Sequence, residues 1–438
     1  MQRDEMILIS VDDHIIEPPD LFVKTLPARF GDAIPRVARY ANGEERWILD
    51  GKVFASTAPA AVSGRVREEL GFEPMRFAEV RRGVWDVDAR IDDMNANGVL
   101  ASLNFPTLPG FAGERFVAGD DKQLMLALVE AYNDWHCDHW AGAHPGRFIP
   151  SAILPLWDAE RCSAEVLRIA RKDVRVVCFP ENPTSFGLPS IHSGHWDRLF
   201  ETLADLDLAV AMHIGTGPLY APTPESPCDV QNTLLNVKIV EAVSDLTFWP
   251  LLRRLPSLRI AMSEGCIGWV PFLCERADAA YRNHRFWTHQ DLGDLLPSDL
   301  IRRHFLFCFH EDDFGLRQRH EIGVDRIAWE CDYPHADSTW PHSAERLWQA
   351  VAELPDDEID RITHANAMRF FRFDPFERID RSAATVGALR ARAGHVDVRP
   401  RSLGGRAPAR SGSVVSSREV AQLVLDAAEG LGEPVALL

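Results

Sequence analysis

Short apolar runs alternate with longer amphipathic stretches along most of the chain. The runs are nearly continuous in apolar residues, which is typical of parallel strands that are covered on both faces. The eight runs lie at residues 6–12, 101–105, 147–154, 174–179, 208–214, 258–264, 305–309 and 326–332. We therefore expect eight buried strands.

The stretches between the runs carry apolar residues at helical spacing. Helices are expected at residues 86–98, 121–142, 158–172, 195–206, 267–284 and 342–354. In the first of them Val87, Ile91 and Met94 share one face, and an Asn-Gly pair marks the end. A strand followed by a helix, repeated eight times, predicts an α/β fold of the (β/α)8, or TIM-barrel, type. A doubly wound open sheet is the alternative, but no G-x-G-x-x-G motif follows the first run.

Residues 23–85 do not follow the repeat. They contain two short β-like runs on either side of Asp50-Gly51, a pair that is typical of a hairpin turn. We expect this segment to be an insertion after the first strand that lies over one mouth of the barrel.

The composition changes after residue 380, so the barrel with its insertion is expected to span residues 1–380. Residues 381–438 are predicted to form an Arg/Gly/Ser-rich linker, without fixed structure around 399–413, followed by a short amphipathic helix at 416–430. That helix docks either on the barrel or on a second subunit, and the sequence leaves both open.

The bulk composition narrows the class of protein. A chain of 438 residues with 46% hydrophobic and 26% charged residues is typical of a globular protein, and its net charge of −18 argues against nucleic acid or an anionic membrane as a partner. There is no apolar stretch long enough for a signal peptide or a membrane span. Eight scattered cysteines without a C-x-x-C pair indicate a reducing, cytoplasmic environment.

Ionisable residues follow several of the expected strands, and the C-terminal ends of barrel strands are where functional groups sit. The first strand ends in Asp12 and His14, which are two residues apart and so lie on the same side of the chain. The fifth and sixth strands end in His213 and Glu264, and Asp332 follows the eighth. Two imidazoles with two carboxylates suit a divalent ion, for which we expect zinc first, with manganese and iron as alternatives.

Four segments together resemble the amidohydrolase-related family, in the branch of aminocarboxymuconate-semialdehyde decarboxylase-like enzymes. They read SVDDHIIEP (10–18), AMHIGTG (211–217), MSEGCIGW (262–269) and ECDYPHADSTWP (330–341), and the similarity runs from about residue 7 to 375. The resemblance implies a metal-dependent (β/α)8 barrel that hydrolyses or decarboxylates small, often aromatic or acidic, molecules. It also implies the metal ligands, which are Asp12, His14, His213 and Asp332.

The chain departs from the family pattern in two places. The first strand often carries His-x-His, whereas here it is Asp12-x-His14, and the extra carboxylate could favour Mn²⁺. The sixth strand usually ends in a catalytic histidine, whereas here it ends in Glu264. Glu264 could act as a base, as a partner of a ligand histidine, or as a metal contact.

The residues favour a metal-dependent hydrolase that cleaves an amide, ester, lactone or C–C bond in a small carbonyl compound. In such an enzyme the cation activates a water molecule, and Asp332 takes the proton of that water. The first alternative is a non-oxidative decarboxylase of a small aromatic or unsaturated carboxylic acid. The second is a barrel that binds a ligand without turnover. Families of this type are often dimeric, so a homo-oligomer is a further expectation.

Several other residues are candidates for the site. His335 is expected to orient the substrate or to donate a proton. The remaining candidates follow barrel strands and are expected to contact the substrate, with the tryptophan closing over a flat molecule: Phe105, Glu181, Asn182, His310 and Trp340.

Overall fold

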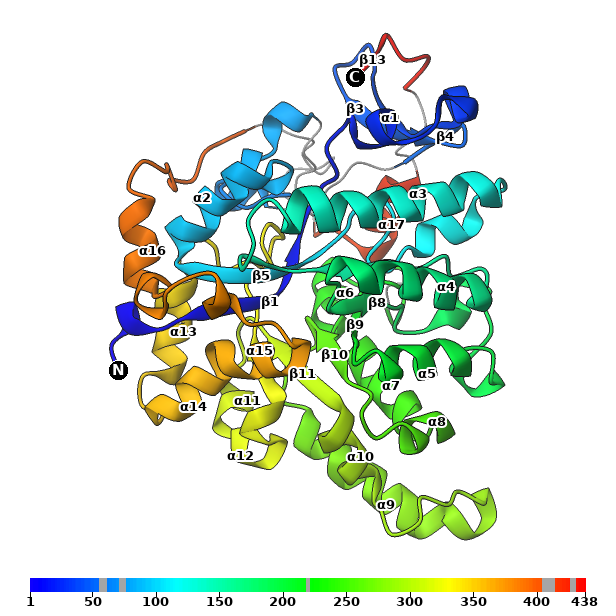
Figure 1. Cartoon of the computed structure of the whole chain (residues 1–438), viewed down its shortest axis with the longest axis vertical. Helices are drawn as coiled ribbons and strands as arrows, with labels where there is room; N and C mark the ends of the chain where they lie inside the picture. The colour runs from blue at the N-terminus through cyan, green and yellow to red at the C-terminus, as the bar shows by residue number, and fades with distance from the viewer. Residues whose placement is uncertain (55–60, 71–75, 218–220, 404–413, 426–430) are drawn as a thin grey trace.

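The structure is a computed structural model, and it describes residues 1–54, 61–70, 76–217, 221–403, 414–425 and 431–438 (Figure 1). A ring of parallel strands lies at its centre. The strands are β1 (Leu8–His14), β5 (Val99–Phe105), β6 (Phe148–Ile149), β7 (Ser151–Ala152), β8 (Val176–Cys178), β9 (Ala209–His213), β10 (Ile260–Ser263), β11 (Phe305–Phe309) and β12 (Ile327–Trp329). Hydrogen bonds join them in two sheets, β1-β5-β6 and β7-β8-β9-β10-β11-β12.

The break between the two sheets is a single proline. Pro150 separates β6 from β7 and has no N–H to continue the ladder, although its carbonyl accepts a hydrogen bond from the Arg175 N–H at 2.9 Å. Counted as one interrupted strand, β6 and β7 make the third of eight strands, which is the number that the apolar runs predict.

The ring closes between its last and first strands. The Asp332 N–H donates to the Asp12 carbonyl at 2.8 Å, and the His14 N–H donates to the Tyr333 carbonyl at 2.6 Å. These two bonds lie just beyond the end of β12, so the seam is closed by the segment that follows the strand. The predicted (β/α)8 barrel is therefore confirmed.

Helices surround the strands, as the apolar spacing predicts. Their bounds are α1 (Leu21–Thr25), α2 (Val87–Asn97), α3 (Lys122–Trp135), α4 (Ala159–Ile169), α5 (Asp197–Asp205), α6 (Cys228–Leu234), α7 (Val237–Thr247), α8 (Pro250–Arg254), α9 (Val270–Thr288), α10 (Pro297–His304), α11 (Asp313–Arg317), α12 (Arg319–Ile322), α13 (Ser343–Val351), α14 (Asp356–Asp360), α15 (Asn366–Phe371), α16 (Val386–Arg392) and α17 (Ser417–Leu425). Local signals set the ends: the Asp86 side chain caps α2, and Gly98 ends it in the left-handed region at φ 78°.

The predicted hairpin is present in the insertion after β1. Strands β3 (Glu45–Leu49) and β4 (Lys52–Val53) flank Asp50 and Gly51, whose φ angles of 51° and 70° match a two-residue hairpin turn. Two strands that the sequence did not indicate extend this antiparallel sheet in the order β13-β2-β3-β4: β2 (Arg36–Arg39) and β13 (Ala436–Leu437).

The C-terminal part is more ordered than its composition indicates. Residues 381–393 pack on the barrel through Val386 and Leu389 of α16, which are buried. The predicted end of the barrel domain at residue 380 stays a prediction. The expectation that the linker lacks fixed structure is wrong for residues 399–403, because the Arg401 N–H donates to the Gly64 carbonyl at 2.9 Å. Residues 404–413 and 426–430 lie outside the described residues. The predicted helix is present as α17.

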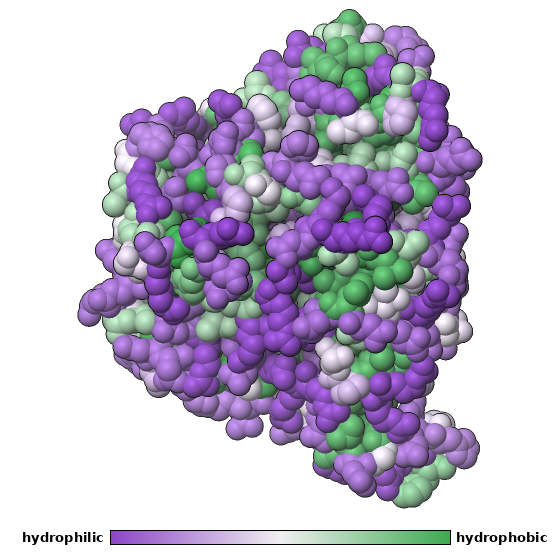
Figure 2. Space-filling view, viewed as in Figure 1, coloured by the Kyte–Doolittle hydropathy of each residue, from purple (hydrophilic) through white to green (hydrophobic). Residues whose placement is uncertain are grey.

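The hydrophilic surface and the free cysteines are those expected from the composition of a globular protein without C-x-x-C pairs. Hydrophilic side chains cover most of the face in Figure 2, with hydrophobic residues in smaller groups between them. The eight cysteines are all free, and most of them are buried. No helix among the described residues combines the length and the apolar character that crossing a bilayer requires.

Candidate metal centre

The four predicted ligands meet at the C-terminal ends of the barrel strands. His14 and His213 point their Nε2 atoms at one another, 3.1 Å apart. The Asp12 carboxylate lies 3.1 Å from the His213 Nε2 and 3.3 Å from the His14 Nε2. Asp332 brings its Oδ1 to 3.4 Å from the same His14 nitrogen. Strands that are 199 residues apart in the chain, β1 and β9, thus present their donors to a common point.

These donors fit a cation. Both carboxylate oxygens of Asp12 and of Asp332 are buried and have no hydrogen-bond partner among the described residues. The His213 Nδ1–H is directed at the Ile214 carbonyl, which leaves the Nε2 lone pair facing the carboxylates. Burying such groups without a partner is costly, and oxygen and imidazole ligands together suit Zn²⁺, Mn²⁺ or Fe²⁺. A divalent ion held by these side chains would remove that cost.

Two further carboxylates lie beside this cluster. Glu264, at the end of β10, brings its Oε2 to 3.3 Å from the His213 Nε2. The backbone N–H of Glu264 in turn donates to the Glu330 carboxylate at 3.2 Å. The sequence reasoning missed Glu330, although a signal existed: it lies two residues before Asp332 and so shares its side of the chain.

His335 lies over the cluster on its open side. Its ring stacks on the His14 ring at 3.7 Å, and its Nδ1 is 2.7 Å from the Asp332 Oδ1. The His335 side chain keeps 16% of its surface exposed, whereas the Asp332 side chain is fully buried. His335 is therefore more accessible from solvent than Asp332.

Phenylalanine rings form an apolar wall next to the histidines. The Phe105 ring lies 5.0 Å from the His213 ring, and the Phe111 ring lies 4.3 Å from it. Phe111 comes from the loop after β5, and no spacing or pattern in the sequence identified it. The loop is held by Glu114, whose carboxylate accepts the N–H groups of Phe111 and Ala112.

The other predicted substrate contacts are less central. The buried Glu181 carboxylate accepts the Gly217 N–H at 3.1 Å, in the loop after His213. Asn182 is exposed, and its side chain caps a short 3-10 turn through Thr184. His310 places its Nδ1 4.0 Å from the Glu330 carboxylate. The role of each in binding a substrate stays a prediction.

The Trp340 side chain packs inside the protein and does not face the open side of the site. Its indole N–H donates to the Asp93 carbonyl at 3.1 Å, its ring lies 5.8 Å from the Tyr333 ring, and the Arg81 guanidinium lies over its ring at 4.3 Å. In this structure its ring does not cover the metal-binding side chains, so closure over a flat substrate would need the loop to move.

Burial shifts the pKa values of several groups in and beside the cluster. It raises the pKa of Glu264 to about 8, and the neighbouring Asp332 charge adds to this. Burial likewise raises the pKa values of Asp12 and Asp332 well above the ordinary aspartate value. It lowers the pKa of His335 to about 4. Burial also lowers the pKa of His14. Without a cation the buried carboxylates therefore favour their protonated forms, so a metal ion must displace protons when it binds.

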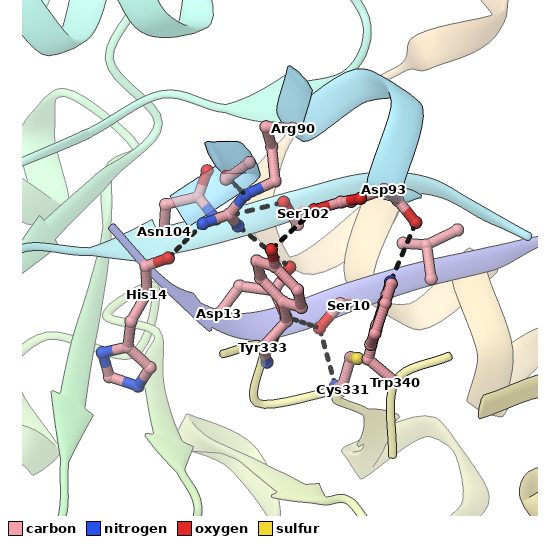
Figure 3. A network of polar contacts seen from close by, with 12 residues as sticks. Ser10, Asp13, His14, Arg90, Asp93, Ser102, Asn104, Cys331, Tyr333 and Trp340 are labelled. Carbon is pink, nitrogen blue, oxygen red and sulfur yellow. Dashed lines mark hydrogen bonds and ion pairs between the residues drawn. The ribbon is translucent and has the colours of Figure 1, made fainter. Parts of the chain in front are cut away.

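A second polar network lies behind the cluster, on the outer side of β1 (Figure 3). Because side chains alternate along a strand, Asp13 points away from Asp12 and His14. It accepts the Ser10 hydroxyl at 3.0 Å and the Tyr333 N–H at 3.1 Å, and it lies 3.7 Å from the buried Arg90 guanidinium of α2. Arg90 also donates to the His14 carbonyl, while the His14 ring points away from the network.

The network continues to the loop that follows β12. The Tyr333 hydroxyl donates to the Asp93 carboxylate at 2.7 Å, and Arg81 donates to the same carboxylate at 2.6 and 2.8 Å. The Arg90 guanidinium lies over the Tyr333 ring at 4.5 Å. Helix α2 thereby contacts the His14 carbonyl and the Tyr333 side chain, and these two residues form one of the two hydrogen bonds of the barrel seam.

Replacing Arg90 with leucine is expected to destabilise the protein by about 3–5 kcal/mol, because it leaves the buried Asp13 carboxylate without its compensating charge. Denaturant-induced unfolding measures the change. Arg82→Leu is the matched control: Arg82 pairs with Asp86 on the surface, so its loss should cost no more than about 1 kcal/mol. A change below 1 kcal/mol for Arg90→Leu would contradict the role given to the network.

Replacing His213 with alanine is expected to remove the bound divalent ion from the purified protein while the fold remains. The control is His304→Ala, since His304 is also buried but binds only the Leu258 carbonyl among the described residues. Elemental analysis and circular dichroism provide the readouts. Full metal content in the His213 variant would refute the assignment of this ligand.

The metal-free protein should lose stability as the pH rises from about 4.5 to about 8. Glu264 keeps its proton in the folded state up to about pH 8 but loses it at ordinary values when the chain unfolds, so the unfolded state binds fewer protons across this window. Glu264→Gln should reduce the slope of the free energy of unfolding against pH by up to about 1.4 kcal/mol per pH unit. Thermal unfolding of chelator-treated protein checks this, and identical slopes for the two proteins would contradict it.

Comparison with known proteins agrees with this architecture. The family model described as Amidohydrolase matches residues 35–373, a range that begins after β1 and so leaves Asp12 and His14 outside it. The chain is 23% identical over 328 residues to 2-amino-3-carboxymuconate-6-semialdehyde decarboxylase of Dictyostelium discoideum, which covers 68% of this chain and 80% of that protein.

Solved structures share the fold at lower identity. An amidohydrolase (map2389c) of Mycobacterium avium subsp. paratuberculosis K-10 superposes with a TM-score of 0.66 at 20% identity, over 83% of this chain and 99% of that one. The 5-carboxyvanillate decarboxylase of Novosphingobium aromaticivorans, solved with manganese and 4-hydroxy-3-methoxy-5-nitrobenzoic acid, gives 0.60 at 17% identity, over 85% and 99%. With the family match spanning most of its length, the chain is a member of the amidohydrolase family of enzymes.

Proposed function

We propose that this protein is a metal-dependent carboxy-lyase that releases CO₂ from a small aromatic or unsaturated carboxylic acid. The observation that carries the proposal is the buried cluster of two carboxylates and two imidazoles, in which the carboxylate oxygens form no hydrogen bond among the described residues. The cluster lies beside a wall of two phenylalanine rings. The names of the relatives favour decarboxylation over hydrolysis, since a curated relative and several solved structures are decarboxylases.

Asp12, His14, His213 and Asp332 would hold the cation. Manganese is favoured over zinc, because two carboxylates are a harder ligand set than histidines alone and because three of the similar structures contain manganese. When bound, the ion would neutralise the carboxylates and polarise the oxygens of an acidic substrate. The aromatic part of the substrate would then lie against Phe105 and Phe111.

Glu264 is the proposed proton donor. Decarboxylation breaks the bond between the ring carbon and the carboxylate, so CO₂ leaves and the carbon needs a proton. Burial raises the pKa of Glu264 to about 8 in the metal-free protein, and in this proposal Glu264 delivers the proton to the carbon from its carboxyl oxygen. Solvent then returns a proton to Glu264. His335, held by Asp332 at 2.7 Å, orients the substrate at the open side.

Hydrolysis is the second candidate, and one contact favours it. The 2.7 Å pair between His335 and Asp332 could accept a proton from water as well as orient a substrate. The two reactions differ in what they consume and release, so they can be told apart directly.

The test uses manganese-loaded protein with 5-carboxyvanillate, 2,6-dihydroxybenzoate and related acids, alongside a panel of amides and lactones. We expect CO₂ release, and in D₂O a product that carries one deuterium at the carbon that lost CO₂. Glu264→Gln should lower turnover about 10²–10⁴-fold at unchanged manganese content. Glu311→Gln, a surface carboxylate paired with Arg346, is the control. Water consumption without CO₂ would show a hydrolase instead.

A further inference from the structure

The chain turns sharply where it leaves β10, at residues 264–266. Glu264 and Cys266 adopt left-handed backbone conformations there, with φ angles of 58° and 54°, which residues other than glycine rarely take. We propose that Asn236, directly before α7, is a positioning residue: it holds this turn and thereby places the Glu264 carboxyl beside the metal-binding side chains. The proposal rests on the proposed function only in that Glu264 is taken to be the proton donor.

Side chains from two distant parts of the chain hold the backbone of Glu264. The Asn236 Nδ2 donates to the Glu264 carbonyl at 2.8 Å, and the Glu264 N–H donates to the Glu330 carboxylate at 3.2 Å. The same Asn236 nitrogen lies 3.4 Å from the Cys266 Sγ. One amide group therefore contacts both of the residues that have a left-handed conformation.

Gly265 brings the turn into close contact with α7. A Cβ atom at this position would lie 2.7 Å from the Cγ2 of Ile239, a buried residue of α7, so glycine is needed for this approach. The Trp269 indole N–H donates to the Gly265 carbonyl at 2.7 Å. The turn is thus packed against α7 at its middle residue, while Asn236 bonds to it from the start of the same helix.

The Asn236 side chain is not needed to begin α7. An asparagine directly before a helix commonly accepts an N–H group of the first turn, but the side chain of Asn236 makes no such bond. Within the part of the chain that the structure describes, its amide nitrogen contacts the turn at residues 264–266. Removing this side chain should therefore alter the turn and leave the helix in place.

The position of the Glu264 carboxyl depends on this backbone conformation. In the turn as it stands, the Glu264 Oε2 lies 3.3 Å from the His213 Nε2. A left-handed conformation is costly for glutamate, and it persists where surrounding contacts enforce it. Loss of the Asn236 bond should let the turn relax and move the carboxyl away from the cluster. Because proton transfer requires the donor within hydrogen-bond reach of the reacting atom, a small displacement should slow the reaction.

Two variants remove the amide donor without adding charge. Asn236→Leu keeps nearly the size of the side chain, and Asn236→Ala removes it. The matched control is Asn232→Ala, because Asn232 is an exposed asparagine of α6 in the same connection between β9 and β10. Each Asn236 change is also made in the Glu264→Gln protein.

The first readout is hydrogen exchange at the Glu264 amide, with and without manganese. It should accelerate about tenfold in both Asn236 variants and stay unchanged in the control. The second is kcat for whichever of 5-carboxyvanillate and 2,6-dihydroxybenzoate releases CO₂. It should fall about tenfold, with KM and manganese content unchanged. In the Glu264→Gln protein the same changes should lower kcat less than about twofold, because Asn236 acts through Glu264.

Unchanged exchange at the Glu264 amide in both Asn236 variants would overturn the proposal. So would an equal loss of kcat with and without the Glu264 carboxyl, since the residue would then act on the structure in general. Faster exchange without CO₂ release from any acid supports the hold on the turn and refutes the proposed reaction. CO₂ release that depends on Glu264 but not on Asn236 gives the converse.

Discussion

Two backbone hydrogen bonds across the seam between β12 and β1 bring Asp332 beside Asp12 and His14. The same bonds close the barrel, so the fold cannot form without gathering carboxylates at one point of its rim. The carboxylate oxygens of Asp12 and Asp332 form no hydrogen bond among the described residues, and the groups nearest to them include imidazole nitrogens. A site that concentrates uncompensated negative charge must take up either protons or a cation, and this requirement links the architecture to a metal-dependent chemistry.

Strand β1 serves two purposes because its side chains alternate. The inward residues, Asp12 and His14, contribute to the cluster, whereas the outward Asp13 contacts Arg90 of α2. Arg90 returns to the backbone of His14, so the outer network fixes the position of an inner ligand. The Asp-Asp-His sequence is thus one structural unit: its outer carboxylate is compensated by arginine, and its inner groups are left for a ligand.

Much of this could be predicted from the sequence. Strands buried on both faces leave a continuous apolar signal, and a polar residue at the end of such a run, as in His213 or Glu264, stands out against it. Phe111 could not be found, because an aromatic residue in a loop has the same local pattern whether it packs on a histidine or on a neighbouring helix. The C-terminal segment was misjudged at residues 399–403 because its order comes from backbone bonds to residues more than 300 positions earlier, which composition does not encode.

The seam has a consequence for how the chain is made. Strand β1 leaves the ribosome well before its partner along the closing edge, because Asp332 is synthesised 320 residues later than Asp12. At about 5–20 residues per second this is a delay on the order of 15–60 s, during which one edge of the nascent sheet has no permanent neighbour. Productive synthesis therefore depends on shielding that edge until the last strand arrives.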